Sequence, residues 1–284
     1  MNYLSRRKLT YWLLALPALG FLGLQIWPLG YAVKSAVTNS AGHLTTAHFQ
    51  QVFSDPLYWA AVRNNFIIPI ASVAFETVIG VGMALWFYSI RKRKTFWRTV
   101  AIVPYAVPEI VYLLTMKLVF REHGYLNSLL LNLHGSTWIV DWFQPGRVLV
   151  MVVIIFIDAW RVTPVVFLIV LMALEQLSES FLEAARLDGA TRWQLIRFIQ
   201  IPLIVPALMV AIALRAVDAF RIFATPLVLL GVEALPVITS VAYHYKAEAN
   251  NPAAANVTAL SLAVLLFAGT LVTILFTAKK RDQR

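Results

Sequence analysis

Six charged side chains interrupt long apolar stretches of this sequence, and they are the residues that could do chemistry there. They are Glu76, Glu109, Asp158, Arg161, Arg215 and Asp218. A charge at the centre of a membrane-spanning helix costs about 2.5 to 3.5 kcal/mol to insert. Such side chains are therefore expected to face protein or a water-filled cavity. Structural ion pairs between helices are the favoured interpretation, and lining of a solute path or relay of protons are the alternatives.

The spacing of these charges allows pairs along single helix faces. Asp158 and Arg161, like Arg215 and Asp218, are three residues apart, which places them on one face of a helix. A solute path would also need aromatic faces and amide or hydroxyl groups. The candidates for such a path are Asn65, Tyr112, Trp160, Arg215 and Asp218.

No constellation for catalysis, metal binding or cofactor binding emerges from the sequence. It contains no Cys, and its five His show no metal-ligand spacing. There is no Ser/His/Asp context, and no Gly is followed by Lys, so the phosphate-binding loop of an ATPase is missing. We therefore expect a chain that is not an enzyme, has no catalytic residues and binds no metal or cofactor of its own.

The composition excludes an ordinary soluble enzyme. Hydrophobic residues make up 60% of the 284 residues and charged residues 13%, whereas a soluble domain carries about 25% charged residues. About twenty apolar residues suffice to cross a bilayer. The sequence predicts a single all-α membrane domain over 1–284 with six such spans, at 10–33, 65–88, 99–120, 148–171, 202–224 and 257–276. The first span is too long for the apolar part of a signal peptide and is expected to be retained.

The basic residues predict the orientation of these spans. One side would hold Arg6, Arg7, Lys8, Arg91, Lys92, Arg93, Lys94, Arg98, Arg186, Arg192, Arg197, Lys279, Lys280, Arg281 and Arg284. The other side would hold only Lys34, Arg63, Arg121, Arg147 and Lys246. The positive-inside rule then places both termini in the cytoplasm of a multi-pass protein of the inner membrane. The net charge of +10 is thus explained by topology and by anionic lipid, and not by a nucleic-acid partner.

The cytoplasmic segment 175–201, between spans four and five, is polar but patterned. It reads EQLSESFLEAARLDGATRWQLIRFIQI and leads directly into Pro202. Two capping boxes are expected, one from Ser180 to Glu183 and one from Thr191 to Gln194. Gly189 between them suits a turn with positive φ. The segment therefore predicts helix, glycine turn, helix. On these grounds alone, an amphipathic hairpin on the membrane surface and a docking element for a cytoplasmic partner remain equally open.

The spacing within this segment is more specific. Glu183-Ala184-Ala185, Gly189, Ile199 and Ile201-Pro202 resemble the EAA signature of permease subunits in binding-protein-dependent ABC importers, with Ile201 where that pattern has Leu. Asp188-Gly189-Ala190 is typical of the carbohydrate-uptake branch. The segments 55–59 and 124–130 are similar to the larger maltose permease and the glycerol-3-phosphate permease. Two features depart from the family: no large outer domain is inserted, and 230–234 replaces a Thr-Gly-Gly-Pro-like turn.

The resemblance implies a type I ABC importer permease fold with a cytoplasmic coupling helix. Such a subunit pairs with a second, similar permease, two cytoplasmic ATPase subunits that hold ATP and Mg, and an extracytoplasmic binding protein. It implies transport of a sugar or sugar-derived solute, with coupling to the ATPase through Glu183, Ala184, Ala185, Asp188, Gly189, Ile201 and Pro202. The alternative is a stand-alone ion-coupled transporter or channel that uses the intramembrane charges.

Overall fold

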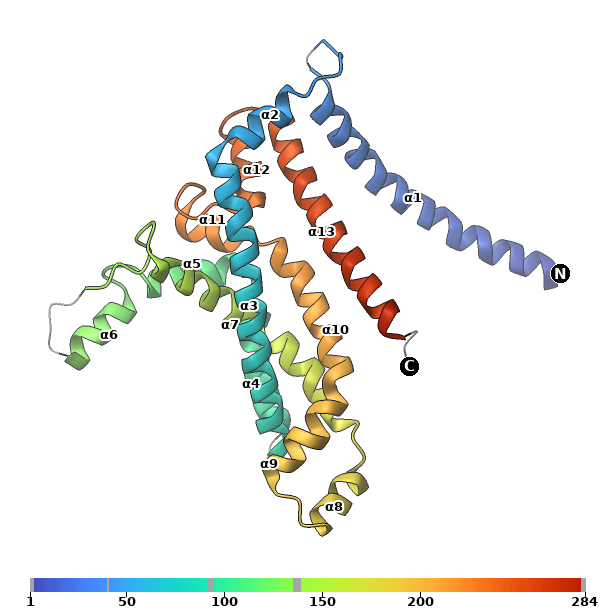
Figure 1. Cartoon of the computed structure of the whole chain (residues 1–284), viewed down its shortest axis with the longest axis vertical. Helices are drawn as coiled ribbons and strands as arrows, with labels where there is room; N and C mark the ends of the chain where they lie inside the picture. The colour runs from blue at the N-terminus through green and yellow to red at the C-terminus, as the bar shows by residue number, and fades with distance from the viewer. Residues whose placement is uncertain (1–2, 40, 91–93, 135–138, 282–284) are drawn as a thin grey trace. The chain divides into compact units, whose positions relative to one another are not determined.

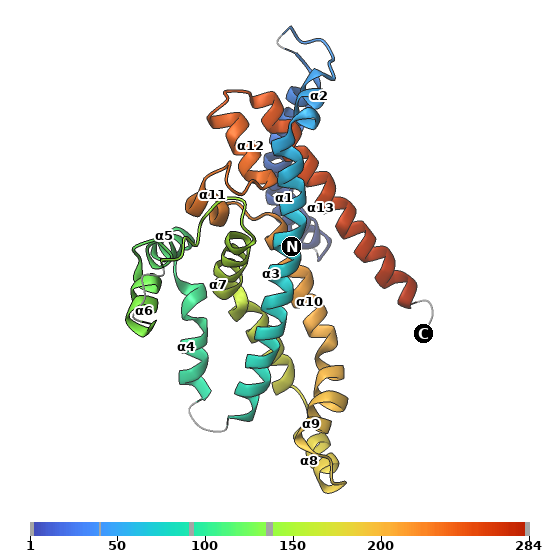
Figure 2. The ribbon, with the colours of Figure 1, turned by 60° about the vertical axis from the view of Figure 1, so that its left-hand side comes forward.

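The computed structural model describes residues 3–39, 41–90, 94–134 and 139–281. Within these ranges every regular element is a helix, apart from one isolated bridge between Thr38 and Leu44, so the all-helical prediction is confirmed (Figures 1 and 2). Some basic residues used above for orientation lie outside the described ranges, namely Arg91, Lys92, Arg93 and Arg284.

The chain divides into two compact units. Unit 1 comprises 1–59 and 241–284, and unit 2 comprises 60–240. The helices are α1 (Tyr3–Val37), α2 (Ala47–Ser54), α3 (Pro56–Ser89), α4 (Lys94–Ala106), α5 (Glu109–Val119), α6 (Tyr125–His134), α7 (Val148–Glu175), α8 (Glu179–Leu187), α9 (Arg192–Gln194), a π-helical segment (Leu195–Gln200), α10 (Ile201–Phe220), α11 (Ala224–Leu230), α12 (Ile238–Ala247) and α13 (Pro252–Arg281).

In unit 1, α13 packs against both α1 and α2. Two polar contacts join the start of α3 and the end of α2 to the C-terminal part of the chain. Tyr245 donates a hydrogen bond to Asp55, and Asn251 donates one to Gln51. Burial, together with the hydrogen bond to Asp55, raises the pKa of the Tyr245 phenol above its usual value. The phenol is therefore protonated at neutral pH and serves as the donor.

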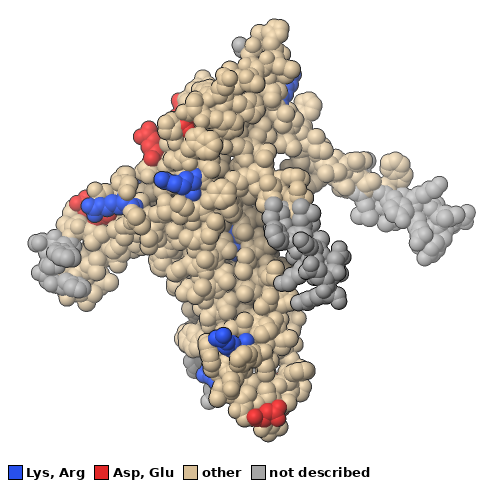
Figure 3. Space-filling model, in the orientation of Figure 1, with Lys and Arg blue, Asp and Glu red and all other residues tan. Residues whose placement is uncertain are grey.

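Four helical stretches are long and apolar enough to cross a membrane: Pro56–Ser89, Val148–Glu175, Arg192–Phe220 and Pro252–Leu271. They contain the predicted spans 65–88 and 148–171 and most of 202–224 and 257–276. The predicted end of the fifth span at 224 is too late, because α10 ends at Phe220 and α11 is a separate short helix. The surface in Figure 3 agrees with a membrane protein, since most of it is uncharged and charged side chains form small, separate groups.

The predicted span at 99–120 is not one continuous helix. This stretch is a broken pair, α4 and α5, whose axes differ by 87°. The cause is Pro108, which lies at the N-cap of α5 with φ −53° and ψ 133°. A proline disfavours the helical region for the residue before it, here Val107, and donates no backbone hydrogen bond itself. The described residues therefore give four spans, or five with the broken pair counted as one.

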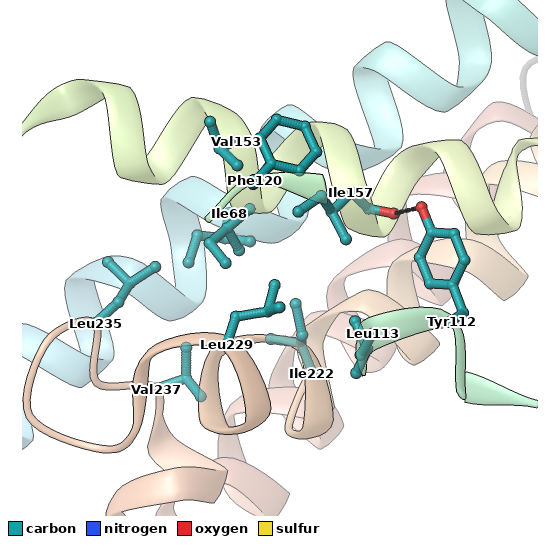
Figure 4. Packing of buried hydrophobic residues seen from close by; sticks show 11 residues of the cluster. Ile68, Tyr112, Leu113, Phe120, Val153, Ile157, Ile222, Leu229, Leu235 and Val237 are labelled. Carbon is teal, nitrogen blue, oxygen red and sulfur yellow. Dashed lines mark hydrogen bonds between the residues drawn. The ribbon is translucent and has the colours of Figure 1, made fainter. Parts of the chain in front are cut away.

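Two buried apolar clusters hold unit 2 together. Figure 4 shows the first, in which side chains of α3, α5 and α7 meet those of 222–237; its members include Ile68, Leu113, Ile157 and Leu229. The second joins α3, α7 and α10 toward their other ends. A Cβ on Gly80 of α3 would lie 2.9 Å from the Val166 Cβ, so this glycine permits close packing of α3 on α7 in the second cluster.

The link between α5 and α7 is organised by one buried amide. Asn127 of α6 donates to the carbonyl oxygens of Glu122 (2.7 Å) and Val140 (2.8 Å). Its Oδ1 accepts from the Val140 N–H (3.3 Å) and the Trp142 indole N–H (3.1 Å). The Asn127 side chain therefore connects the segment before α6 and the segment after α6 to this helix.

Replacing Asn127 with Ala is expected to destabilise this link. Each buried polar group left without a partner costs about 1 to 3 kcal/mol in stability. The substitution removes the hydrogen-bond partner of several such groups at once. We expect faster proteolytic cleavage within 121–147 and an unfolding free energy lower by about 3 kcal/mol. Asn132 on the same helix is exposed, so Asn132→Ala is the matched control, and equal effects of both variants would contradict this role.

Candidate functional site

The segment between α7 and α10 folds as helix, glycine turn, helix, as predicted. α8 ends at Leu187, Asp188 is its C-cap, and Gly189 follows with φ +85°. The backbone then turns through Ala190 and Thr191 into α9. A φ in this region is easily adopted by glycine and strained for most other residues. Gly189 therefore sets the angle between α8 and the helix that follows.

One of the two predicted capping boxes is present. Gln194 N–H donates to Thr191 Oγ1 (3.3 Å), and Thr191 N–H donates to Gln194 Oε1 (2.7 Å). The box predicted from Ser180 to Glu183 is wrong. α8 begins at Glu179 with Ser178 at its N-cap, two residues before the predicted N-cap Ser180. The Ser178 side chain makes no capping hydrogen bond, and its hydroxyl lies 2.6 Å from the Ser180 hydroxyl. Glu183 therefore does not cap its helix, and its carboxylate is exposed.

α9, the π-helical segment and α10 form one continuous helical rod from Arg192 to Phe220. The wide turn ends at Ile201, whose N–H donates to the carbonyl of Ile196, five residues back. Pro202 follows immediately, at the head of α10. Local π turns of this kind occur often at functional sites. The α8–α9 turn therefore runs without a break into α10.

One side of the α8–α9 turn is buried, and the other side is exposed to solvent. Leu182 and Leu195 are buried and fix the segment to unit 2. Leu187 is 88% exposed and Trp193 64% exposed, and Ala184 is exposed as well. An apolar surface of this kind, carried on a rigid turn, is typical of a site for another protein.

A second candidate site is a cavity of about 300 Å³ within unit 2. Its lining includes Tyr105 and six charged side chains. Three are carboxylates and three are guanidinium groups, from Glu109, Asp158, Arg161, Arg215, Asp218 and Arg221. Tyr105 and Glu109 come from the two sides of the break between α4 and α5. Broken membrane helices frequently border solute sites, because their free backbone groups can face a cavity.

Arg215 is the centre of the ion pairs beside this cavity. Its Nε donates to Glu76 Oε2 (2.8 Å) and its Nη2 to Glu76 Oε1 (3.2 Å). Its Nη1 donates to Asp218 Oδ2 (3.3 Å). The Ser72 hydroxyl lies 2.9 Å from Glu76 Oε1 and 3.0 Å from Asp158 Oδ2. Since a hydroxyl has one proton, Ser72 donates to one of these carboxylates at a time.

The favoured interpretation of the intramembrane charges as ion pairs agrees with this geometry, but one predicted pair is wrong. Asp158 does not pair with Arg161. Arg161 reaches across to Glu109 on α5 (3.2 Å), and Asp158 also accepts from the Thr225 hydroxyl (3.3 Å). The i, i+3 pair is replaced because partners on neighbouring helices are nearer than the one on the same helix.

Of the candidate solute-path residues, only Arg215 and Asp218 line the cavity. Asn65 is buried and joins the Phe220 carbonyl (2.8 Å) to the Ile238 N–H (3.0 Å). Tyr112 donates to the Ile157 carbonyl (2.9 Å) within the first apolar cluster (Figure 4). Trp160 stacks on Phe156 away from the cavity lining. The contribution of Tyr105 was missed, and the Val107-Pro108 pair was the sequence signal for the break that places it there.

Comparison with known proteins identifies the family of the chain. Residues 76–281 match the family described as binding-protein-dependent transport system inner membrane component. The trehalose transport system permease protein SugA of Mycobacterium tuberculosis is 27% identical over 80% of this chain and 75% of its own length. The trehalose/maltose transport system permease protein MalF of Thermococcus litoralis is 30% identical over 65% of this chain and 62% of its own length.

Among solved structures, a chain of a bacterial ABC transporter that imports the acidic polysaccharide alginate superposes with a TM-score of 0.83. It has 20% sequence identity and covers 99% of both chains. This likeness confirms the predicted type of permease fold. The chain therefore belongs to the family of inner membrane components of binding-protein-dependent transport systems.

Proposed function

We propose that this chain is one of two permease subunits of an ATP-driven importer for a sugar or sugar-derived solute. The observation that carries the proposal is the α8–α9 turn, which is exposed, rigid and continuous with α10. The sugar class is supported by the relatives, whose names refer to trehalose and maltose, and by Asp188-Gly189-Ala190 in the turn.

In this proposal, Glu183, Ala184, Ala185, Asp188 and Gly189 dock on a cytoplasmic ATPase subunit. The alanines allow close approach of the two backbones. The exposed Glu183 carboxylate is available to a basic group of the ATPase. Ile201 and Pro202 begin α10 directly behind the turn and pass a rigid-body movement into the membrane. ATP and Mg are held by the ATPase subunits, and this chain supplies no catalytic group.

The six-span topology is part of the same proposal. The first predicted span, at 10–33, lies in α1, a helix of 35 residues that is about 52 Å long at 1.5 Å per residue. That length is sufficient to cross a bilayer. Both termini are then cytoplasmic, on the side of the α8–α9 turn, and a binding protein delivers the solute on the other side.

The solute path runs through the charged cavity, with Arg215 and Asp218 in its wall. Polar groups at mid-membrane are typical of the central site in transporters that work by alternating access. The stand-alone ion-coupled transporter is not favoured, because the family is defined by its dependence on a binding protein.

The test is co-purification followed by reconstitution. The chain, expressed with a second permease and an ATPase encoded by the same source, should form a stable complex. That complex should take up a saccharide only with ATP and a binding protein. Ion-driven uptake by the lone chain would instead support the stand-alone transporter.

A further inference from the structure

A second cavity in the described part of unit 2 lies apart from the charged one. It has a volume of about 520 Å³ and lies in the angle between the end of α3 and the α8–α9 turn. Figure 2 shows the two elements at the same end of the unit. Nothing in the proposed function uses this cavity.

The polar lining of this cavity favours an anion. Arg186 and Arg192 both line it, with Tyr88 and Glu179. Among the described residues, neither guanidinium makes an ion pair. Two arginines against one carboxylate leave a positive balance, and guanidinium groups bind phosphate by paired, charge-assisted hydrogen bonds.

A largely buried glutamine also lines the cavity. Gln200, in the last position of the π-helical segment, is only 8% exposed and belongs to the lining. Its side chain has no hydrogen-bond partner within the described ranges, and its amide atoms are not among the fully enclosed ones. The amide is therefore free to donate a hydrogen bond to a ligand in the cavity.

Most of the remaining lining is apolar. Leu85, Leu182, Ala190, Leu195 and Ile196 form these walls, and Ser89 adds a hydroxyl group. The cavity is at the end of the membrane-spanning α3, where Trp86 is exposed. Aromatic side chains of this kind are enriched at the level of the lipid headgroups. A ligand with a phosphate and an apolar part fits these surroundings.

We propose that this cavity binds a phosphate-bearing anion, held by Arg186, Arg192 and Gln200, and thereby fixes the angle of the α8–α9 turn. The phosphate can come from an anionic phospholipid or from a soluble phosphate ester. Glu179, Leu182 and Arg186 share one face of α8, whereas Ala184 and Asp188 of the proposed docking surface lie on the opposite face and Glu183 lies beside the cavity face.

The test uses the assembled transporter in detergent and measures binding by calorimetry. The probes are dioctanoyl phosphatidylglycerol, dioctanoyl phosphatidylcholine and inorganic phosphate. We expect phosphatidylglycerol to bind at least tenfold more tightly than phosphatidylcholine. Binding of inorganic phosphate as well would identify soluble phosphates as sufficient, whereas binding of phosphatidylglycerol alone would identify a lipid. Equal binding of both lipids, or binding of none of the probes, overturns the proposal.

Matched variants separate the cavity from general surface charge. Arg186→Gln and Arg192→Gln should each weaken binding at least tenfold. Arg197→Gln removes the same charge from the same segment, but Arg197 does not line the cavity, so it should change binding less than twofold. Equal losses in all three variants overturn the proposal. Gln200→Leu preserves net charge and should weaken binding severalfold, and because none of these readouts is transport, failure here is distinct from failure of the proposed function.

Discussion

Gly189→Asp is expected to lower solute uptake by the reconstituted complex at least about 100-fold while the chain still inserts and assembles. Within this chain the new side chain meets nothing, since no atom lies within 4 Å of a Cβ at this position. The φ of +85° strains a residue other than glycine by about 1 to 2 kcal/mol. The added carboxylate also lies in the proposed docking surface, and a loss of about 2.7 kcal/mol in docking corresponds to a factor of 100.

The matched control is Gly146→Asp. Gly146 has φ +78° and is equally open, so it carries the same local strain, but it lies before α7 and away from the α8–α9 turn. We expect uptake within twofold of the parent protein. The charge reversal Glu183→Lys, which creates no backbone strain, should abolish uptake as well. Normal uptake by both Gly189→Asp and Glu183→Lys would remove the coupling role from this segment.

Breaking the Arg215–Glu76 pair is expected to destabilise the protein more than any single surface change. The two side chains are 7% and 0% exposed, so removing Arg215 leaves Glu76 buried without its ion-pair partner, and removing Glu76 leaves the buried Arg215 with only the exposed Asp218. That situation costs about 3 to 5 kcal/mol. Arg215→Leu and Glu76→Leu should each lower the unfolding free energy of the assembled complex by about this amount.

The double variant is the informative comparison. Replacing both members by leucine removes the unpaired charge, and such replacements are often neutral. We therefore expect the double variant to recover most of the stability that either single change loses. The Arg98–Glu175 pair, whose side chains are 34% and 30% exposed, is the control, with an expected loss of about 0 to 1 kcal/mol. Additive losses in the buried pair would show that the two side chains act independently.

Local chemistry made part of the turn predictable from the sequence. Thr191 and Gln194 form their capping box because both partners are within four residues and nothing else competes for them. Gly189 takes positive φ for the same local reason. The box at Ser180 failed because α8 begins two residues earlier, with Ser178 in the N-cap position, and residue spacing alone does not rank two neighbouring serines.

The bend and the contacts between helices were harder to predict from the sequence. Hydropathy located the apolar stretches, but it averages over a window and cannot detect a bend such as the one at Pro108. The choice of Glu109 over Asp158 as partner of Arg161 depends on how α5 packs on α7, which is a tertiary property. The buried positions of Asn65 and Tyr112 likewise follow from helix packing, since an amide or a phenol is equally suited to a cavity wall or to a buried hydrogen bond.

The unbroken helix from Arg192 to Phe220 joins the α8–α9 turn to the charged cavity, and these two sites are far apart along the helix. Arg215 lies 23 residues beyond Arg192, which is about 35 Å at 1.5 Å per residue. A tilt of about 5° at the Arg192 end would carry Arg215 sideways by about 3 Å, which is more than a hydrogen bond can stretch and survive. The hydrogen bonds from the Arg215 guanidinium to Glu76 would therefore break or form with a very small angular change at the Arg192 end of this helix.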